Sequence, residues 1–358
     1  MRLHILPSRI LLLVTAVAAL AACSSSKAAA PESSTTTTVA AVPASSTTVP
    51  AAAVAAQASA ACGATPKVAA GDAKVNTTSS GVARWYYRHV PASYSGTTPM
   101  PVVLDLHGYS EGATIHRVMS GMGAFGDAHG FVTITPQGSG TAVALWNTDL
   151  KSNDVKFIGD LLDEIEKTLC VDEHRIFVTG LSNGAFITSA IACAYSDRVA
   201  AVAPVAGIRD IPGCTFTRPV PVIAFHGTAD PFVAYTGGLG PKALLLPTPD
   251  GKSTIGKSRG GGAASKGPSI PRITADWAKR NGCGAQPTDV ALTSDVTSVA
   301  FPCPAGAEVV LERVTGGGHS WPGSTFSQTI VGVVGKTTMT ISADALMWQF
   351  FVAHPLRN

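Results

Sequence analysis

The chain has 358 residues, of which 46% are hydrophobic and 14% charged, and its formal net charge is +3. This balance suits a globular domain with an ample core and excludes a disordered protein. A net charge so close to zero favours neither nucleic acid nor an anionic membrane surface as a partner.

Residues 1–22 have the composition of a signal peptide. Arg2 and Arg9 precede a short apolar run, which ends in Leu20-Ala21-Ala22 before Cys23. The run is too short to span a bilayer comfortably. A cysteine in this position resembles a bacterial lipobox, so we expect a diacylglycerol on Cys23 that holds an extracytoplasmic protein at the cell membrane. Ordinary cleavage, with release of the protein, is the alternative.

The segment that follows the anchor, to residue 61, is predicted to be a tether. Residues 24–60 consist almost entirely of Ala, Ser, Thr, Pro and Val. Such a segment lacks the large apolar side chains that offset the entropy of ordering a chain. A flexible chain of this length averages roughly 35 Å from end to end. The folded domain is therefore expected to cover residues 62–358.

The remaining cysteines predict disulfides. Six are left once Cys23 is acylated, and an even number in an exported chain indicates three bonds. Cys283 and Cys303 flank one short segment and are the favoured pair. No Cys-x-x-Cys or paired Cys/His spacing suggests a metal site. The pairing stays open for the other four cysteines, which are Cys62, Cys170, Cys193 and Cys214.

From residue 62 onward, apolar runs of strand length alternate with helical patterns. Strands are predicted over residues 83–90, 102–106, 131–135, 175–179, 200–206, 220–225 and 308–314. Helices are predicted over residues 114–129, 154–169, 183–195, 271–280 and 343–353. This alternation implies an α/β fold with a mostly parallel central sheet and helices on both faces. Residues 236–269, rich in Gly, Pro, Ser and Lys, are expected to form a long, flexible insertion.

The pattern Gly-x-Ser-x-Gly occurs at residues 108–112, 180–184 and 256–260. A nucleophile elbow needs a strand, a tight turn that carries the serine, and an immediate helix. Only the second occurrence lies between a predicted strand and a predicted helix, so Ser182 is the candidate nucleophile. Residues 251–258 also match a phosphate-binding P-loop, but glycines follow where that loop requires a helix.

A serine nucleophile needs a base, usually histidine, and a carboxylate that orients the base. In this fold the chain order is serine, acid, histidine. His319 lies in a glycine-rich loop after a predicted strand and is the candidate base. Asp230 follows another strand end and is favoured as the acid over Asp210. His226 precedes this acid, which favours a structural role for its ring.

Two backbone N–H groups should stabilise the developing oxyanion. One belongs to Asn183, which follows the nucleophile. The other is assigned to Tyr109, in the loop after an early strand, where Gly108 lets the backbone turn. Three aromatic residues near these motifs are candidate contacts for the acyl or alcohol part of an ester, with core packing as the alternative: Trp146, Tyr235 and Trp321.

Together these segments resemble the exported polyhydroxybutyrate depolymerases and feruloyl/acetylxylan esterases of the α/β-hydrolase fold. The resemblance is carried, in the family's order, by residues 106–108, 136–138, 154–158, 178–184, 226–230, 233–235 and 318–323. It implies Ser182, Asp230 and His319 as the triad, requires no metal or cofactor, and supports the Cys283–Cys303 bond. Departures from the family pattern, such as alanine at residues 185 and 234, leave the substrate class open.

We therefore expect an exported serine esterase that acts as a monomer on a small or polymeric carboxylic ester. Ser182 attacks the carbonyl, His319 transfers the protons, and water releases the acyl group. A non-catalytic solute-binding lipoprotein and a serine peptidase of the same fold are the alternatives. The triad order argues against the first, and the lack of length for a large extra domain argues against the second.

Overall fold

The computed structural model describes residues 54–64, 68–260 and 267–357. The predicted signal peptide, the anchor residue Cys23 and most of the predicted tether lie outside the described residues. Within the described ranges, no helix has the length and apolar character needed to cross a membrane.

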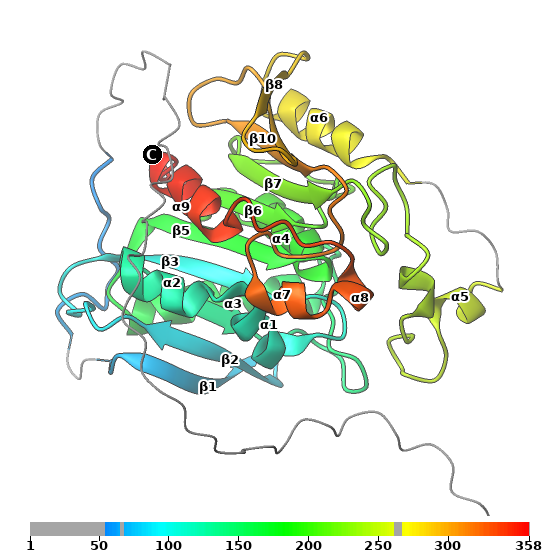
Figure 1. The fold of residues 1–358 in the computed structure, drawn as a ribbon. Helices are drawn as coiled ribbons and strands as arrows, with labels where there is room; N and C mark the ends of the chain where they lie inside the picture. Colours follow the sequence, from blue (N-terminus) through cyan, green and yellow to red (C-terminus); the bar gives the residue numbers. More distant parts are fainter. Residues whose placement is uncertain (1–53, 65–67, 261–266, 358) are drawn as a thin grey trace, which may run out of the picture. The chain divides into compact units, whose positions relative to one another are not determined.

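The described strands form one ten-stranded sheet (Figure 1). They are β1 (Gly71–Ser79), β2 (Val82–Val90), β3 (Met100–Leu106), β4 (Val132–Pro136), β5 (Val171–Leu181), β6 (Ala201–Val205), β7 (Val222–Gly227), β8 (Thr288–Ala291), β9 (Val296–Ala300) and β10 (Val309–Val314). Their order is β1-β2-β4-β3-β5-β6-β7-β10-β9-β8. The strands from β4 to β10 in this order are parallel, and β2 and β9 pair antiparallel with the two ends of that block.

Helices cover both faces of the sheet (Figure 1). They are α1 (Gly112–Ser120), α2 (Met122–His129), α3 (Asn153–Thr168), α4 (Asn183–Ala194), η1 (Ala243–Leu245), α5 (Ile255–Ser258), α6 (Ile270–Arg280), α7 (Thr325–Thr329), α8 (Val331–Val334) and α9 (Ala343–Ala353). One apolar core lies under α3, α4 and α6, and a second lies under α1, α2 and α9. Strand β3 supplies both, because Val102 and Leu104 enter the first core and Val103 the second.

Each predicted strand and helix has a counterpart in the structure, and the predicted fold class is confirmed. The helix expected over residues 114–129 is two helices, because Gly121 between them has a φ of 68°, a left-handed conformation that ends α1. Strands β1, β8 and β9 were not predicted, because most of their side chains are small, polar or exposed. The segment 236–260, expected to be flexible, contains η1 and α5.

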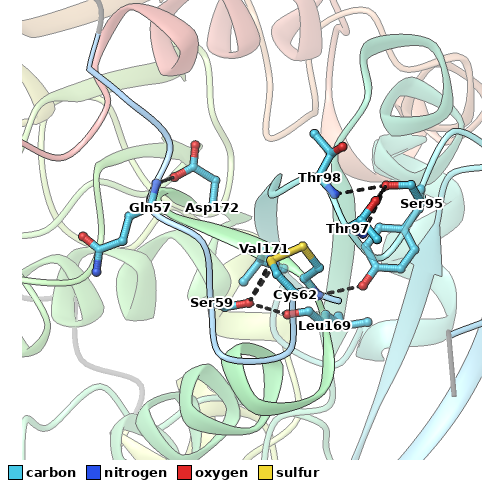
Figure 2. The surroundings of a disulfide bond; sticks show 11 residues. Gln57, Ser59, Cys62, Ser95, Thr97, Thr98, Leu169, Val171 and Asp172 are labelled. Atoms are coloured by element: carbon cyan, nitrogen blue, oxygen red, sulfur yellow. Dashed lines mark hydrogen bonds between the residues drawn. A yellow bond between two sulfur atoms is a disulfide. The ribbon is translucent and has the colours of Figure 1, made fainter. Parts of the chain in front are cut away.

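The N-terminal edge of the packed domain lies before residue 62. Residues 54–61, which sequence analysis assigned to the tether, contact the start of β5 (Figure 2). The hydroxyl of Ser59 donates to the carbonyl of Leu169 over 2.7 Å. Cys62 then forms a disulfide with Cys170. The composition did not reveal this attachment, because it depends on backbone and hydroxyl hydrogen bonds rather than apolar burial.

The six cysteines pair completely. The structure contains the predicted Cys283–Cys303 disulfide, and it resolves the open pairing as Cys62–Cys170 and Cys193–Cys214. Of these bonds, Cys62–Cys170 spans the longest stretch of sequence, 108 residues. It ties the entry of the chain to the start of β5, the strand that leads to the candidate nucleophile.

Candidate active site

The candidate nucleophile occupies a strained turn between β5 and α4. Ser182 has φ 57° and ψ −115°, values that a residue with a side chain rarely adopts. The glycines on either side explain why the turn fits. A Cβ on Gly184 would lie 2.0 Å from the carbonyl oxygen of Leu106, and a Cβ on Gly180 would lie 2.6 Å from the same oxygen. Only glycine at both positions lets the elbow pack against the end of β3.

The candidate acid and base are hydrogen-bonded to each other. Nδ1 of His319, after β10, lies 2.7 Å from Oδ2 of Asp230, after β7. The other oxygen, Oδ1, accepts the backbone N–H groups of Phe232 and Val233 over 2.8 and 2.9 Å. Burial raises the pKa of the Asp230 carboxyl, but the adjacent His319 and His226 rings and the backbone hydrogen bond lower it below its usual value. Asp230 is thus a fixed, ionised acceptor.

The rival residues have other roles in the structure. The side chain of His226 is fully buried, and its Nε2 bonds to the carbonyl oxygen of Val233 over 2.9 Å. This agrees with the structural role predicted for it. Asp210 is exposed and forms an ion pair with Arg280. Neither arrangement supplies the base or the acid of a triad.

The sheet topology explains why the three distant residues share one edge. Strands β5, β6, β7 and β10 are successive parallel neighbours, so their carboxyl ends meet on the same side. Ser182, Asp230 and His319 follow three of these ends. In the part of the chain that the structure describes, no hydrogen bond joins the Ser182 hydroxyl to the His319 ring. Catalytic hydrogen bonds of this kind often tighten only around substrate.

The backbone N–H groups of both predicted oxyanion donors, Asn183 and Tyr109, are free to bind a ligand as far as the described residues show. Asn183 is the first residue of α4, so its backbone N–H has no acceptor within the helix. In the loop after β3, Gly108 donates to Oε2 of Glu111 over 2.6 Å, and Ser110 donates to a backbone carbonyl over 2.8 Å. Between them, the N–H of Tyr109 has no hydrogen-bond partner among the described residues. The loop therefore presents one unpaired donor between two anchored ones.

A buried charge cluster, which sequence reasoning missed, holds this loop. Oε2 of Glu111 lies 3.2 Å from Nδ1 of His116, and Nε2 of His116 lies 2.7 Å from Oδ1 of Asp105. Burial lowers the pKa of His116, but the two carboxylates outweigh it and raise the value to about 10. The ring is therefore cationic at neutral pH. Glu111 links this cation to Gly108 and so fixes the backbone before Tyr109. No sequence motif predicted this cluster.

A neutral histidine joins two of the stretches that carried the family resemblance. Nδ1 of His107 donates to the carbonyl oxygen of Gly108 over 2.8 Å, and its Nε2 accepts the N–H of Gly138 over 2.9 Å. Burial lowers the pKa of His107 to about 4, so one ring nitrogen stays free to accept. Residues 106–108 and 136–138 thus form one structural unit. Their joint occurrence in the sequence was the only signal for it.

Two of the three aromatic predictions require correction. Trp146 is 3% exposed and Trp321 is 1% exposed, so neither ring offers a face to a substrate. The indole N–H of Trp146 donates to the carbonyl of His107, and that of Trp321 donates to Asp344. Both are core residues that fix neighbouring loops. Tyr235 is half-buried and lines a separate pocket of about 270 Å³, so substrate contact by this residue stays a prediction.

The insertion contacts both sides of the candidate site. The hydroxyl of Tyr109 donates to the carbonyl oxygen of Pro247 over 2.8 Å. On the other side, Nζ of Lys242 donates to the carbonyl oxygens of Gly332 and Val333, in α8. The end of α8 in turn accepts the backbone N–H of His319 over 2.6 Å. The insertion therefore bridges the loop of Tyr109 and the loop of His319. Among the described residues, no cluster of three His, Cys, Asp or Glu side chains is arranged to bind a metal.

Replacing Glu111 by alanine should lower kcat for 4-nitrophenyl butyrate by about tenfold to a hundredfold, with KM little changed. The N–H of Gly108 then loses its acceptor, and the adjacent Tyr109 donor loses its orientation toward the transition state. Glu111→Gln keeps an oxygen acceptor and should retain more activity. Steady-state kinetics measure both variants. Glu173→Ala, at the far end of β5, is the control, and a change confined to KM would contradict the expectation.

Comparison with known proteins finds relatives that are named as esterases. No family model matches the chain. NocK of Nocardia uniformis subsp. tsuyamanensis, a protein named as an esterase, is 30% identical over 261 residues, which cover 68% of this chain and 71% of NocK. Feruloyl esterase B of Piromyces equi is 27% identical over 64% of this chain, and the match spans only 41% of that protein. Among solved structures, an acetyl xylan esterase from Aspergillus awamori aligns with a TM-score of 0.49 and 15% identity, over 73% of this chain and 98% of the other.

Proposed function

This chain belongs to the α/β-hydrolase family of carboxylic ester hydrolases that includes NocK and feruloyl esterase B, and we propose that Ser182, His319 and Asp230 are its catalytic triad. One observation carries the proposal. The hydrogen bond of 2.7 Å between His319 and Asp230 lies at the strand-end edge where Ser182 occupies its strained turn. These are the parts that a serine esterase requires.

The reaction proceeds through an acyl-enzyme. As Oγ of Ser182 bonds to the ester carbonyl carbon, Nε2 of His319 takes the hydroxyl proton. The carbonyl oxygen becomes an oxyanion and accepts the N–H groups of Tyr109 and Asn183. The bond to the alkoxy group then breaks, and His319 gives its proton to the departing alcohol. Water then attacks the acyl-enzyme, with His319 again as the base, and this step releases the carboxylic acid and restores Ser182. Throughout the reaction Asp230 keeps the His319 ring in the required tautomer.

The proposed substrates are esters of short acyl chains, of ferulate or acetate, or of hydroxyalkanoates. The names of two sequence relatives, a feruloyl esterase and a bifunctional acetylxylan esterase/xylanase, support feruloyl and acetyl esters. A pocket of about 380 Å³ lies beside the nucleophile turn, a volume that suits a small ester or one end of a longer one.

A fluorophosphonate probe tests the nucleophile directly. Such probes phosphonylate an activated serine, so we expect one stoichiometric label, on the peptide that contains Ser182, and parallel loss of 4-nitrophenyl butyrate hydrolysis. Peptide mass spectrometry locates the label. A label on Ser110 or Ser258, the serines of the other two Gly-x-Ser-x-Gly patterns, would show that the nucleophile is misassigned.

We further propose that the enzyme is exported and anchored through Cys23, which lies outside the described residues. The apolar run before Cys23 and the small residues at its end support this proposal. Expressed in a bacterial host, the wild type should partition into the detergent phase of Triton X-114, and Cys23→Ser should partition into the aqueous phase. Equal partition of the two proteins would rule out a lipid at this residue.

A further inference from the structure

The pocket beside the nucleophile turn, of about 380 Å³, is lined by the segments that build the active site. Phe186 lies one turn of α4 after Ser182, about 6 Å along the helix axis. A Cβ on Gly207 would lie 2.6 Å from the carbonyl oxygen of Ser182 and 3.0 Å from the Phe186 ring, so the loop after β6 rests directly on the elbow. Val233, on another wall, donates its N–H to Asp230. The pocket therefore adjoins the elements that carry Ser182 and Asp230, although these two residues do not line it.

The walls of this pocket combine apolar surface with an excess of positive charge. Phe186, Ile208 and Val233 supply apolar surface, and the charged residues that line the pocket are Arg209, Arg259 and Asp210. The single acid is already paired, because the Asp210 carboxylate binds Arg280, which does not line the pocket. Within the described residues, neither Arg209 nor Arg259 has a carboxylate within 4.0 Å. Two cations thus face the cavity without a counter-charge from those residues.

The geometry of Arg209 suits the recognition of an anion. Its guanidinium carbon lies over the Phe186 ring, 4.9 Å from the ring centre, in a cation–π contact that favours this position of the side chain. The residue as a whole is exposed to solvent and lines the pocket, so a ligand in the pocket can contact its side chain. A planar guanidinium offers two parallel N–H donors to a carboxylate, which gives both affinity and orientation.

We propose that this pocket binds a negatively charged group of the substrate, so that the enzyme prefers esters that carry a carboxylate or a similar planar oxyanion several carbon atoms from the reacting carbonyl. Arg209 binds the anion, Arg259 adds attraction from the insertion, and the apolar walls hold the intervening carbon chain. The inference rests on the proposed function, because it assumes that the reacting ester lies at Ser182.

Two matched pairs of substrates test the preference. Mono-4-nitrophenyl adipate and 4-nitrophenyl hexanoate have the same acyl length, and only the first carries a carboxylate. The esters 4-carboxyphenyl hexanoate and 4-carbamoylphenyl hexanoate place the same difference on the alcohol side. We expect kcat/KM to favour the anionic member of one pair by about tenfold, and less so as ionic strength rises. The pair that responds shows whether the acyl or the alcohol part occupies the pocket.

Substitutions locate the preference within the pocket. Arg209→Gln should reduce the anionic-to-neutral ratio to near unity, and Arg209→Lys should give an intermediate ratio, because lysine keeps the charge but not the planar fork. Arg272→Gln, an equal charge change on the exposed face of α6, should leave the ratio unchanged. Equal ratios in the wild type and Arg209→Gln, or no preference in either pair, would overturn the inference. Retained activity in Ser182→Ala would instead overturn the proposed function.

Discussion

Replacing Ser182 by alanine is expected to lower kcat for 4-nitrophenyl butyrate by about a millionfold. The alanine variant keeps the turn and both oxyanion donors, but it has no oxygen that can bond to the carbonyl carbon. What remains is attack by water near the oxyanion hole. Because Ser182 is partly exposed and makes no side-chain hydrogen bond within the described residues, the substitution should leave the melting temperature nearly unchanged.

Ser258→Ala is the matched control for this variant. It removes a serine from another Gly-x-Ser-x-Gly pattern, and the structure places that residue at the end of α5 in the insertion. Its kcat should stay within about twofold of the wild type, as expected for an exposed surface substitution. Measurable acyl-enzyme turnover by Ser182→Ala, in a preparation free of host esterases, would contradict the assignment.

Replacing Asp230 by asparagine should lower kcat by about a thousandfold to ten-thousandfold. The amide oxygen can still accept the N–H groups that Oδ1 now accepts. Its NH₂ group then faces Nδ1 of His319 and donates where the carboxylate accepted. In that arrangement Nδ1 is the acceptor and the ring proton is on Nε2. Nε2 therefore cannot accept the proton of Ser182. The loss should appear in kcat rather than KM.

The control for Asp230→Asn is Asp276→Asn, which alters a partly exposed carboxylate of α6 that pairs with Arg272. Its kcat and KM should match those of the wild type. The pH profile adds a second readout. Because His319 and His226 hold the pKa of Asp230 below its usual value despite burial, the carboxylate stays ionised at mildly acidic pH. Its stabilising contact with His319 is lost only when the pH falls through that lowered pKa. A profile in which Asp230→Asn retains wild-type kcat at any pH would contradict its role.

The nucleophile turn and the His319 loop could be predicted from the sequence, because each depends on residues that are neighbours in the chain. The turn at residues 180–184 requires glycine on both sides of the serine, and the structure shows the contacts of 2.6 and 2.0 Å that would result from any Cβ there. The glycines before His319 similarly open a loop at a strand end. Chain order then suggested the partners of Ser182, because successive parallel strands deliver their loops to one edge.

Features that depend on how side chains pack in three dimensions could not be derived in the same way. Nothing near Glu111 in the sequence shows that it binds Gly108 and lies against His116. The tryptophans at residues 146 and 321 looked like substrate contacts because they adjoin motifs, yet packing buries both. Whether an aromatic ring near a motif faces solvent or core depends on which helices cover it.

By itself, the order of amino acids predicted the fold class, the elbow, and the favoured acid and base. Each follows from spacing along one segment, or from the fixed succession of strand and helix. Only the tertiary structure decided the Cys62–Cys170 and Cys193–Cys214 disulfides, the cluster behind the oxyanion loop and the cationic pocket at Arg209. Those features join residues from separate strands and loops, and their energies depend on burial and distance, which no local pattern encodes.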